Sequence, residues 1–61
     1  MTPREIEIIR MVAQGKTNAS IAKELYLSYH TIIAHRKNIN RKLHVTNAVL
    51  MLEMARQQKL I

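Results

Sequence analysis

Several residue types that support enzyme chemistry are missing from this 61-residue chain. It has no cysteine, no aspartate, no tryptophan and no phenylalanine, and its acidic residues number only 4. Without cysteine, the chain cannot form disulfides, Cys-ligated zinc sites or thiol nucleophiles. The few carboxylates offer no convergent acid–base pair, and the histidines lack the spacing of metal ligands. We therefore expect neither an enzyme nor a protein that binds a metal or another cofactor.

Long apolar runs are also missing, although hydrophobic residues make up 48% of the chain. No stretch approaches the roughly 20 apolar residues of a membrane span, and no secretory signal is visible. The absence of tryptophan and phenylalanine also disfavours insertion into a membrane surface. A chain of 61 residues has room for one small core. We therefore expect residues 1–61 to form a single cytoplasmic domain with no membrane partner.

Negative charge is scarce in this sequence. Lys and Arg number 10 against 4 for Asp and Glu, which gives a formal net charge of +6. An excess of this kind favours a polyanionic partner. Charge alone does not distinguish DNA from RNA or from an anionic membrane.

Strand signals are absent, and apolar residues recur at helical spacing along the whole chain. Good N-capping residues precede four such stretches: Thr2, Thr17, Ser28 and Thr46. We predict an all-α fold, a four-helix bundle with helices at about residues 3–14, 18–25, 29–43 and 46–58. Three residues separate the second helix from the third, which is the connection length of a helix-turn-helix.

The first helix carries the clearest local signals. Thr2 and Glu5 fit a capping box with Pro3 at the first helical position, and Gly15 fits the residue after a helix end. We expect its core-facing side to consist of Ile6, Ile9 and Ala13, with Ile8 and Val12 beside them.

A helical wheel of residues 29–43 separates two faces. One narrow arc, which should face the core, holds Ile32, Ile39 and Leu43. The opposite arc, flanked by Ile33 and Asn38, holds His30, Ala34, Lys37 and Arg41. No acidic residue lies between Glu24 and Glu53. A helix of this kind suits the major groove of DNA, although a solvated basic face would show the same pattern.

A spaced set of residues over nearly the whole chain resembles the LuxR/FixJ/NarL-type helix-turn-helix. The set comprises Thr2-Pro3-Arg4-Glu5, Gly15-Lys16-Thr17-Asn18, Ile21-Ala22, Leu25, Ser28, Thr31-Ile32, His35, Ile39, Arg41-Lys42-Leu43 and Val45. The resemblance implies sequence-specific binding of double-stranded DNA for transcription regulation, by the output domain of a bacterial two-component response regulator. In that family the domain usually follows a receiver or ligand-sensing domain, so we expect residues 1–61 to be the C-terminal part of a longer regulator.

The resemblance also assigns roles to residues of the third predicted helix, which would enter the major groove. It implies base contacts for His30, Ile33, Ala34 and Lys37. It implies phosphate contacts for Thr17, Asn18, Thr31, Arg36, Arg41 and Lys42, which would fix the register of the protein on DNA. Many family members have a polar residue in place of Ile33, which cannot hydrogen-bond a base but can pack on thymine methyl groups.

The fourth predicted helix carries more apolar residues than one small core needs. We expect Val49, Leu50 and Met54 to form a homodimer interface, as the resemblance implies, with two copies pairing only on DNA. The alternative is that Leu50 only packs against Val45, as a hydrophobic staple around the predicted N-cap Thr46. A contact with RNA polymerase is a further expectation.

A different functional class remains open on the sequence alone. Helical domains of sigma-factor type share the helix-turn-helix, so the chain could instead be a protein-interaction module. Binding to DNA should weaken steeply and log-linearly with salt, whereas a mainly apolar protein contact should not.

Overall fold

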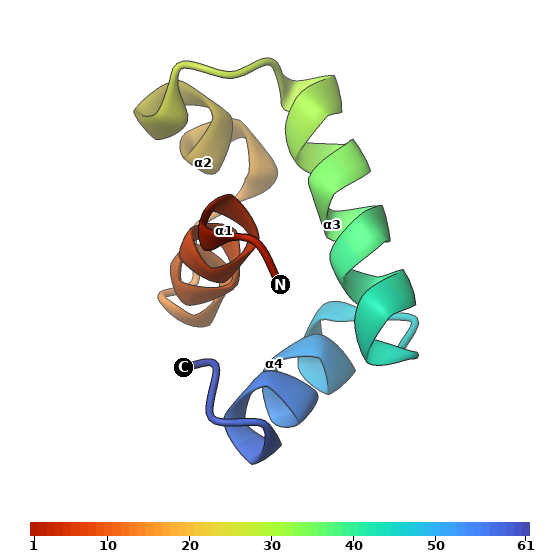
Figure 1. The fold of residues 1–61 in the computed structure, drawn as a ribbon. Coiled ribbons are helices and arrows are strands. Elements are labelled where there is room, and N and C mark those ends of the chain that lie inside the picture. The colour runs from red at the N-terminus through yellow and green to blue at the C-terminus, as the bar shows by residue number, and fades with distance from the viewer.

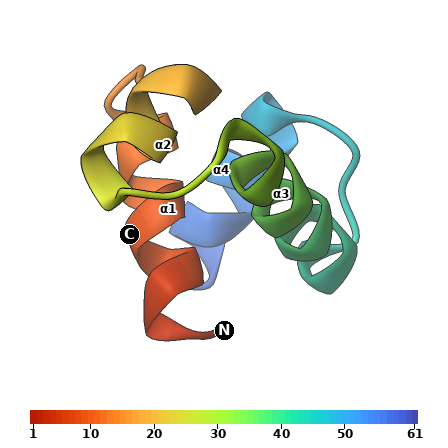
Figure 2. The same cartoon turned by 90° about the horizontal axis from the view of Figure 1, so that it is seen from above.

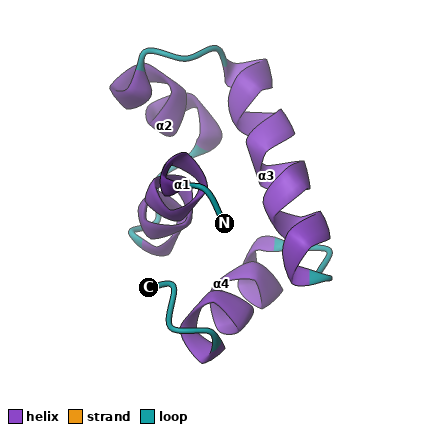
Figure 3. Cartoon of the chain, viewed as in Figure 1, coloured by secondary structure: helices purple, strands orange, loops and turns teal.

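The computed structural model describes all 61 residues, which form four helices and no strand (Figures 1 and 3). The helices are α1 (Pro3–Ala13), α2 (Asn18–Leu25), α3 (Tyr29–Leu43) and α4 (Ala48–Gln57). The predicted all-α fold is confirmed, and the bounds of α2 and α3 agree with the prediction. Helix α1 ends one residue earlier than predicted, and α4 is shorter at both ends.

Both ends of α1 have the local structure that the sequence predicts. The Thr2 hydroxyl accepts from the Glu5 N–H at 3.1 Å, and the Glu5 carboxylate accepts from the Thr2 N–H at 2.9 Å, which completes a capping box. At the other end, Gly15 has a φ of +84°, which glycine adopts without steric cost. The next residue, Lys16, donates its N–H to the Met11 carbonyl and closes a Schellman motif.

The start of α4 differs from the prediction. Asn47, not Thr46, is the N-cap, and its side chain accepts from the Leu50 N–H at 2.9 Å. The end of α3 explains the shift, because His44 is left-handed and Val45 donates back to the Asn40 carbonyl. The chain therefore bends at Thr46 and is extended at Asn47 before the new helix begins. Val45 and Leu50 do not occupy staple positions around this cap.

The four helices share one core. Six large side chains in it are fully buried: Ile8, Ile9, Ile21, Ile32, Ile39 and Met51. The predicted inward arc of α3 is confirmed, since Leu43 is buried as well. On α1 the prediction is partly wrong, because Ala13 is exposed and Met11 is buried. The buried side of α1 is therefore rotated toward Ile8 and Met11.

The arrangement of the helices leaves one face of α3 uncovered. Helix α2 packs on α3, and α1 packs on both α3 and α4. Figure 1 shows α2 at one end of the molecule, α4 at the other and α3 along one side. Figure 2, a view from above, also places α3 at the edge. Because its neighbours all lie on its inner side, the outer side of α3 is free to meet a partner.

Candidate nucleic-acid interface

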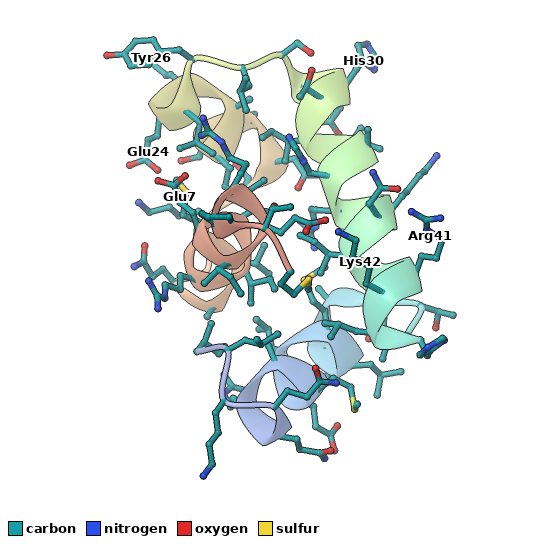
Figure 4. All side chains as sticks on the ribbon, in the orientation of Figure 1. Glu7, Glu24, Tyr26, His30, Arg41 and Lys42 are labelled. Atoms are coloured by element: carbon teal, nitrogen blue, oxygen red, sulfur yellow. The ribbon has the colours of Figure 1, made fainter.

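The outer face of α3 presents the side chains that the wheel placed there. His30, Ala34, Lys37 and Arg41 are exposed, while Ile33 is half-buried at the edge. In Figure 4, His30 projects from the first turn and Arg41 projects outward near the other end. Helix α3 is 15 residues long, and the exposed residues span most of its length. We call the exposed set His30, Ala34, Lys37 and Arg41 the outer face of α3.

The first turn of α3 is fixed by its own side chains. The Ser28 hydroxyl accepts from the Thr31 N–H at 3.0 Å and lies 2.8 Å from the Thr31 hydroxyl. These contacts satisfy one of the free N–H groups at the start of the helix. Tyr29 packs edge-on against His30, with ring centroids 5.9 Å apart. The Ser28 contacts therefore fix the start of the helix, and the Tyr29 ring packs against the His30 ring.

Two of the predicted phosphate contacts lie together between α2 and α3. The Arg36 guanidinium donates a hydrogen bond to the side-chain oxygen of Asn18, and both residues are half-buried. Asn18 is the first residue of α2, directly after its N-cap Thr17. The Thr17 hydroxyl accepts from the Ser20 N–H at 3.1 Å and remains exposed. Arg36 and Asn18 thus tie the two helices of the helix-turn-helix to each other.

The last turn of α3 separates two neighbouring cations. Arg41 is exposed, and its one side-chain partner is Asn38 at 3.3 Å. Lys42 instead donates to the Glu5 carboxylate at 2.8 Å. Figure 4 shows Arg41 turned outward and Lys42 turned inward, toward α1. The family resemblance implied the same phosphate contact for both residues, and the structure gives them different surroundings.

Glu5 is a residue whose tertiary role the sequence did not reveal. Its side chain is 5% exposed, and it accepts from Lys42 and from the Thr2 N–H. The Lys42 hydrogen bond, together with the hydrogen bonds from Thr2, lowers the pKa of Glu5 to about 2 despite its burial. The capping box placed Glu5 correctly in α1. No local signal links it to a lysine 37 positions away.

Acidic side chains lie on the other side of the molecule from the outer face of α3. Glu7 pairs with Arg4 at 3.3 Å, and Glu24 pairs with Lys16 at 2.8 Å. These residues line an open groove between α1 and α2 (Figure 4). Because each carboxylate there has a cationic partner, the groove carries mixed and largely compensated charge.

The exposed apolar side chains of α4 lie near its start. Val49 is 75% exposed and Leu50 is 39% exposed. Met54, which was predicted to join them in an interface, is half-buried and packs against the core. The outward apolar surface of α4 is therefore small and centres on Val49 and Leu50.

No group of three or more His, Asp or Glu side chains is placed to hold a metal ion. None of the four helices combines the length and apolarity that a membrane crossing requires.

Comparison with protein families and curated proteins gives a consistent result. The family described as bacterial regulatory proteins, luxR family, matches residues 1–55. The chain is 44% identical to the uncharacterized response regulatory protein YgeK of Escherichia coli, over 90% of this chain and 37% of that protein. It is 34% identical to the oxygen regulatory protein NreC of Staphylococcus carnosus, over 100% of this chain and 28% of NreC.

A solved structure has the same architecture. The crystal structure of the response regulator ChrA from a heme-sensing two-component system superposes with a TM-score of 0.95 at 40% sequence identity. The match covers 98% of this chain and 30% of ChrA. The chain thus spans about a third of the length of these relatives.

Proposed function

The chain belongs to the LuxR family of bacterial regulatory proteins, whose helix-turn-helix domains bind specific DNA sequences to regulate transcription, and we propose that it reads its site by inserting α3 into the major groove. The observation that carries this proposal is the outer face of α3. It combines exposed donors and a small residue on a helix face that no other element covers. The major groove is wide enough for such a helix.

Within the groove, the outer face supplies two kinds of base contact. Lys37 and His30 can donate hydrogen bonds, Lys37 to the O6 or N7 of guanine. Ala34 allows close approach of the helix backbone, and its methyl group, like the half-buried Ile33, can pack on a thymine methyl. The preferred half-site should therefore contain both a guanine and a thymine within reach of one helix face.

Contacts to phosphates hold the helix in register. We assign them to Arg41 and to the exposed or half-exposed hydroxyls of Thr17 and Thr31, which lie at the starts of α2 and α3. Helix N-termini add backbone N–H groups that attract anions. The hydrogen-bonded Arg36 and Asn18 brace α2 against α3, and their remaining donors stay available to a phosphate.

We propose that two copies pair through α4 when they bind adjacent half-sites. The exposed Val49 and Leu50 supply a small apolar contact, with Met54 at its edge. A patch of this size is far below the roughly 800 Å² per partner of a stable interface. Pairing should therefore depend on DNA, which holds the two copies at a high local concentration.

The relatives support a proposal about the protein that contains this domain. YgeK and ChrA are named as response regulators, and this chain spans 37% and 30% of their lengths. We propose that it is the output domain of such a regulator, which acts in the bacterial cytoplasm. A contact with RNA polymerase would then be made by a surface other than the outer face of α3.

Selection of bound duplexes from a random DNA pool tests the proposed function. We expect one enriched half-site, repeated at a fixed spacing and orientation. Binding to the enriched duplex should weaken log-linearly with salt, as release of counterions requires. Failure to enrich any sequence, or binding that does not respond to salt, would favour the protein-interaction module instead.

A further inference from the structure

The ion pair between Glu5 and Lys42 joins the first turn of α1 to the last turn of α3. Lys42 donates to the Glu5 carboxylate at 2.8 Å, and the Glu5 side chain is only 5% exposed. The same carboxylate oxygen accepts from the Thr2 N–H at 2.9 Å. One buried carboxylate therefore serves the capping box of α1 and holds the end of α3 at the same time.

A second hydrogen bond, nearer the start of α3, attaches this helix to α2. Arg36 donates to Asn18 at the start of α2, so α3 is tied to α2 at one level and to α1 at another. Arg36 and Lys42 are six positions apart, which corresponds to roughly 9 Å along the helix axis. Two attachments at separate positions along α3 restrict both its tilt and its sliding on the rest of the domain.

A phosphate would compete with Glu5 for the Lys42 ammonium, which is held at Glu5 although its side chain is 41% exposed. If Lys42 turned fully to a phosphate, the almost fully buried Glu5 carboxylate would lose its cationic partner, which is strongly unfavourable. Arg41, the adjacent residue, has no carboxylate partner and is exposed. Two neighbouring cations on one helix are therefore in different situations, because Lys42 is held by a buried carboxylate and Arg41 is not.

We propose that Lys42 is a positioning residue, which acts through Glu5 to hold α3 at the angle that DNA recognition needs, and that it makes no phosphate contact of its own. This inference rests on the proposed function. It replaces the phosphate role that the sequence resemblance implied for Lys42. It also means that Glu5, an acidic residue, supports DNA binding through Lys42 without contacting the DNA.

The salt dependence of binding separates a positioning lysine from a phosphate contact. Each phosphate contact that is lost reduces the slope of log K against log salt by about 0.9. We expect Arg41→Gln to reduce the slope by this amount, and Lys42→Gln to leave it unchanged. Lys42→Gln should still lower the affinity for the enriched duplex by about tenfold, the scale on which coupling through a packed element acts. A reduced slope for Lys42→Gln would overturn the proposal.

Two further variants distinguish positioning from mere loss of stability. Glu5→Gln keeps a capping-box residue and should lower the affinity for the enriched duplex by a similar factor, whereas Lys42→Arg, which keeps the pair, should restore it. All measurements are made at a temperature where circular dichroism shows each variant fully folded. Unchanged affinity of folded Lys42→Gln would overturn the proposal. If the unaltered domain itself shows no salt-dependent binding, the proposed function fails instead.

Discussion

The two sides of this small domain differ in whether their charged side chains have partners of opposite charge. On the side formed by α1 and α2, Glu7 and Glu24 line an open groove, and each pairs with a nearby cation. On the outer face of α3, Lys37 and Arg41 have no carboxylate partner. The uncovered side of α3 therefore presents two cations that no carboxylate neutralises. The difference shows that the placement of Glu7 and Glu24 distinguishes the two sides as much as the placement of the basic residues does.

The largest effect should follow from placing an acid on the outer face of α3. Ala34→Glu sets a carboxylate against the groove, where like charges cost several kcal/mol, and we expect affinity to fall more than about a hundredfold. Gln14→Glu makes the same charge change at an exposed position of the α1–α2 groove and should cost little. Fluorescence anisotropy on the enriched duplex measures both. Equal losses would mean that the two sides do not differ in function.

Alanine substitutions sharpen the comparison within the outer face. Lys37→Ala should weaken binding to the enriched duplex by about 1–3 kcal/mol, the value of a good base contact, and should weaken binding to random DNA much less. Arg41→Ala should weaken both by a similar factor, because phosphates carry no sequence information. Parallel losses in both variants would remove Lys37 from the base-reading set.

The ion pair between Glu5 and Lys42 should make the stability of the domain depend on pH. The pKa of Glu5 falls from 4.5 to about 2 in the folded protein, so its contribution to stability is complete above pH 4.5 and is lost between pH 4.5 and 2. Over this range we expect the free energy of unfolding to drop by about 1–2 kcal/mol, less than the full shift implies because solvent screens the half-exposed Lys42.

Urea unfolding at a series of pH values measures this dependence. Glu5→Gln should remove the acid-dependent part, while Glu7→Gln, at an exposed pair, should leave it in place. A profile for Glu5→Gln that matches the unaltered protein would show that the pair with Lys42 adds nothing to stability.

The smallest effect should come from α4, whose apolar surface is limited. Val49→Glu should reduce cooperative binding to two adjacent half-sites by about fivefold, the lower end of typical coupling between sites. Binding to a single half-site should be unchanged, because Val49 is 75% exposed and a carboxylate in the first turn of a helix favours the fold. Gln14→Glu serves again as the matched control. Unchanged cooperativity would place the dimer contact elsewhere.

Features that depend on a few neighbouring residues could be predicted from the sequence. The capping box of Thr2 and Glu5, the left-handed Gly15 and the inward arc of α3 are all local, and the structure confirms them. The outer face of α3 could be predicted for the same reason, because it is the complement of that arc. Its contacts with bases stay a prediction.

Features that depend on packing could not be predicted in this way. Thr46 and Asn47 are both good N-caps, and the backbone path out of α3 decides between them. Ala13 has an apolar side chain, yet the crossing of α1 over α3 and α4 turns it to solvent. The pairing of Lys42 with Glu5 joins residues 37 positions apart, and spacing along one helix gives no sign of it.

Titration of the enriched duplex into isotope-labelled protein, followed by nuclear magnetic resonance, tests the central claim most directly. If α3 reads the bases, the largest shift changes will fall on His30, Ala34 and Lys37, and the signals of Glu7 and Gln14 in the α1–α2 groove will barely move. The largest changes in that groove, with the signals of Ala34 and Lys37 unaffected, would contradict the account.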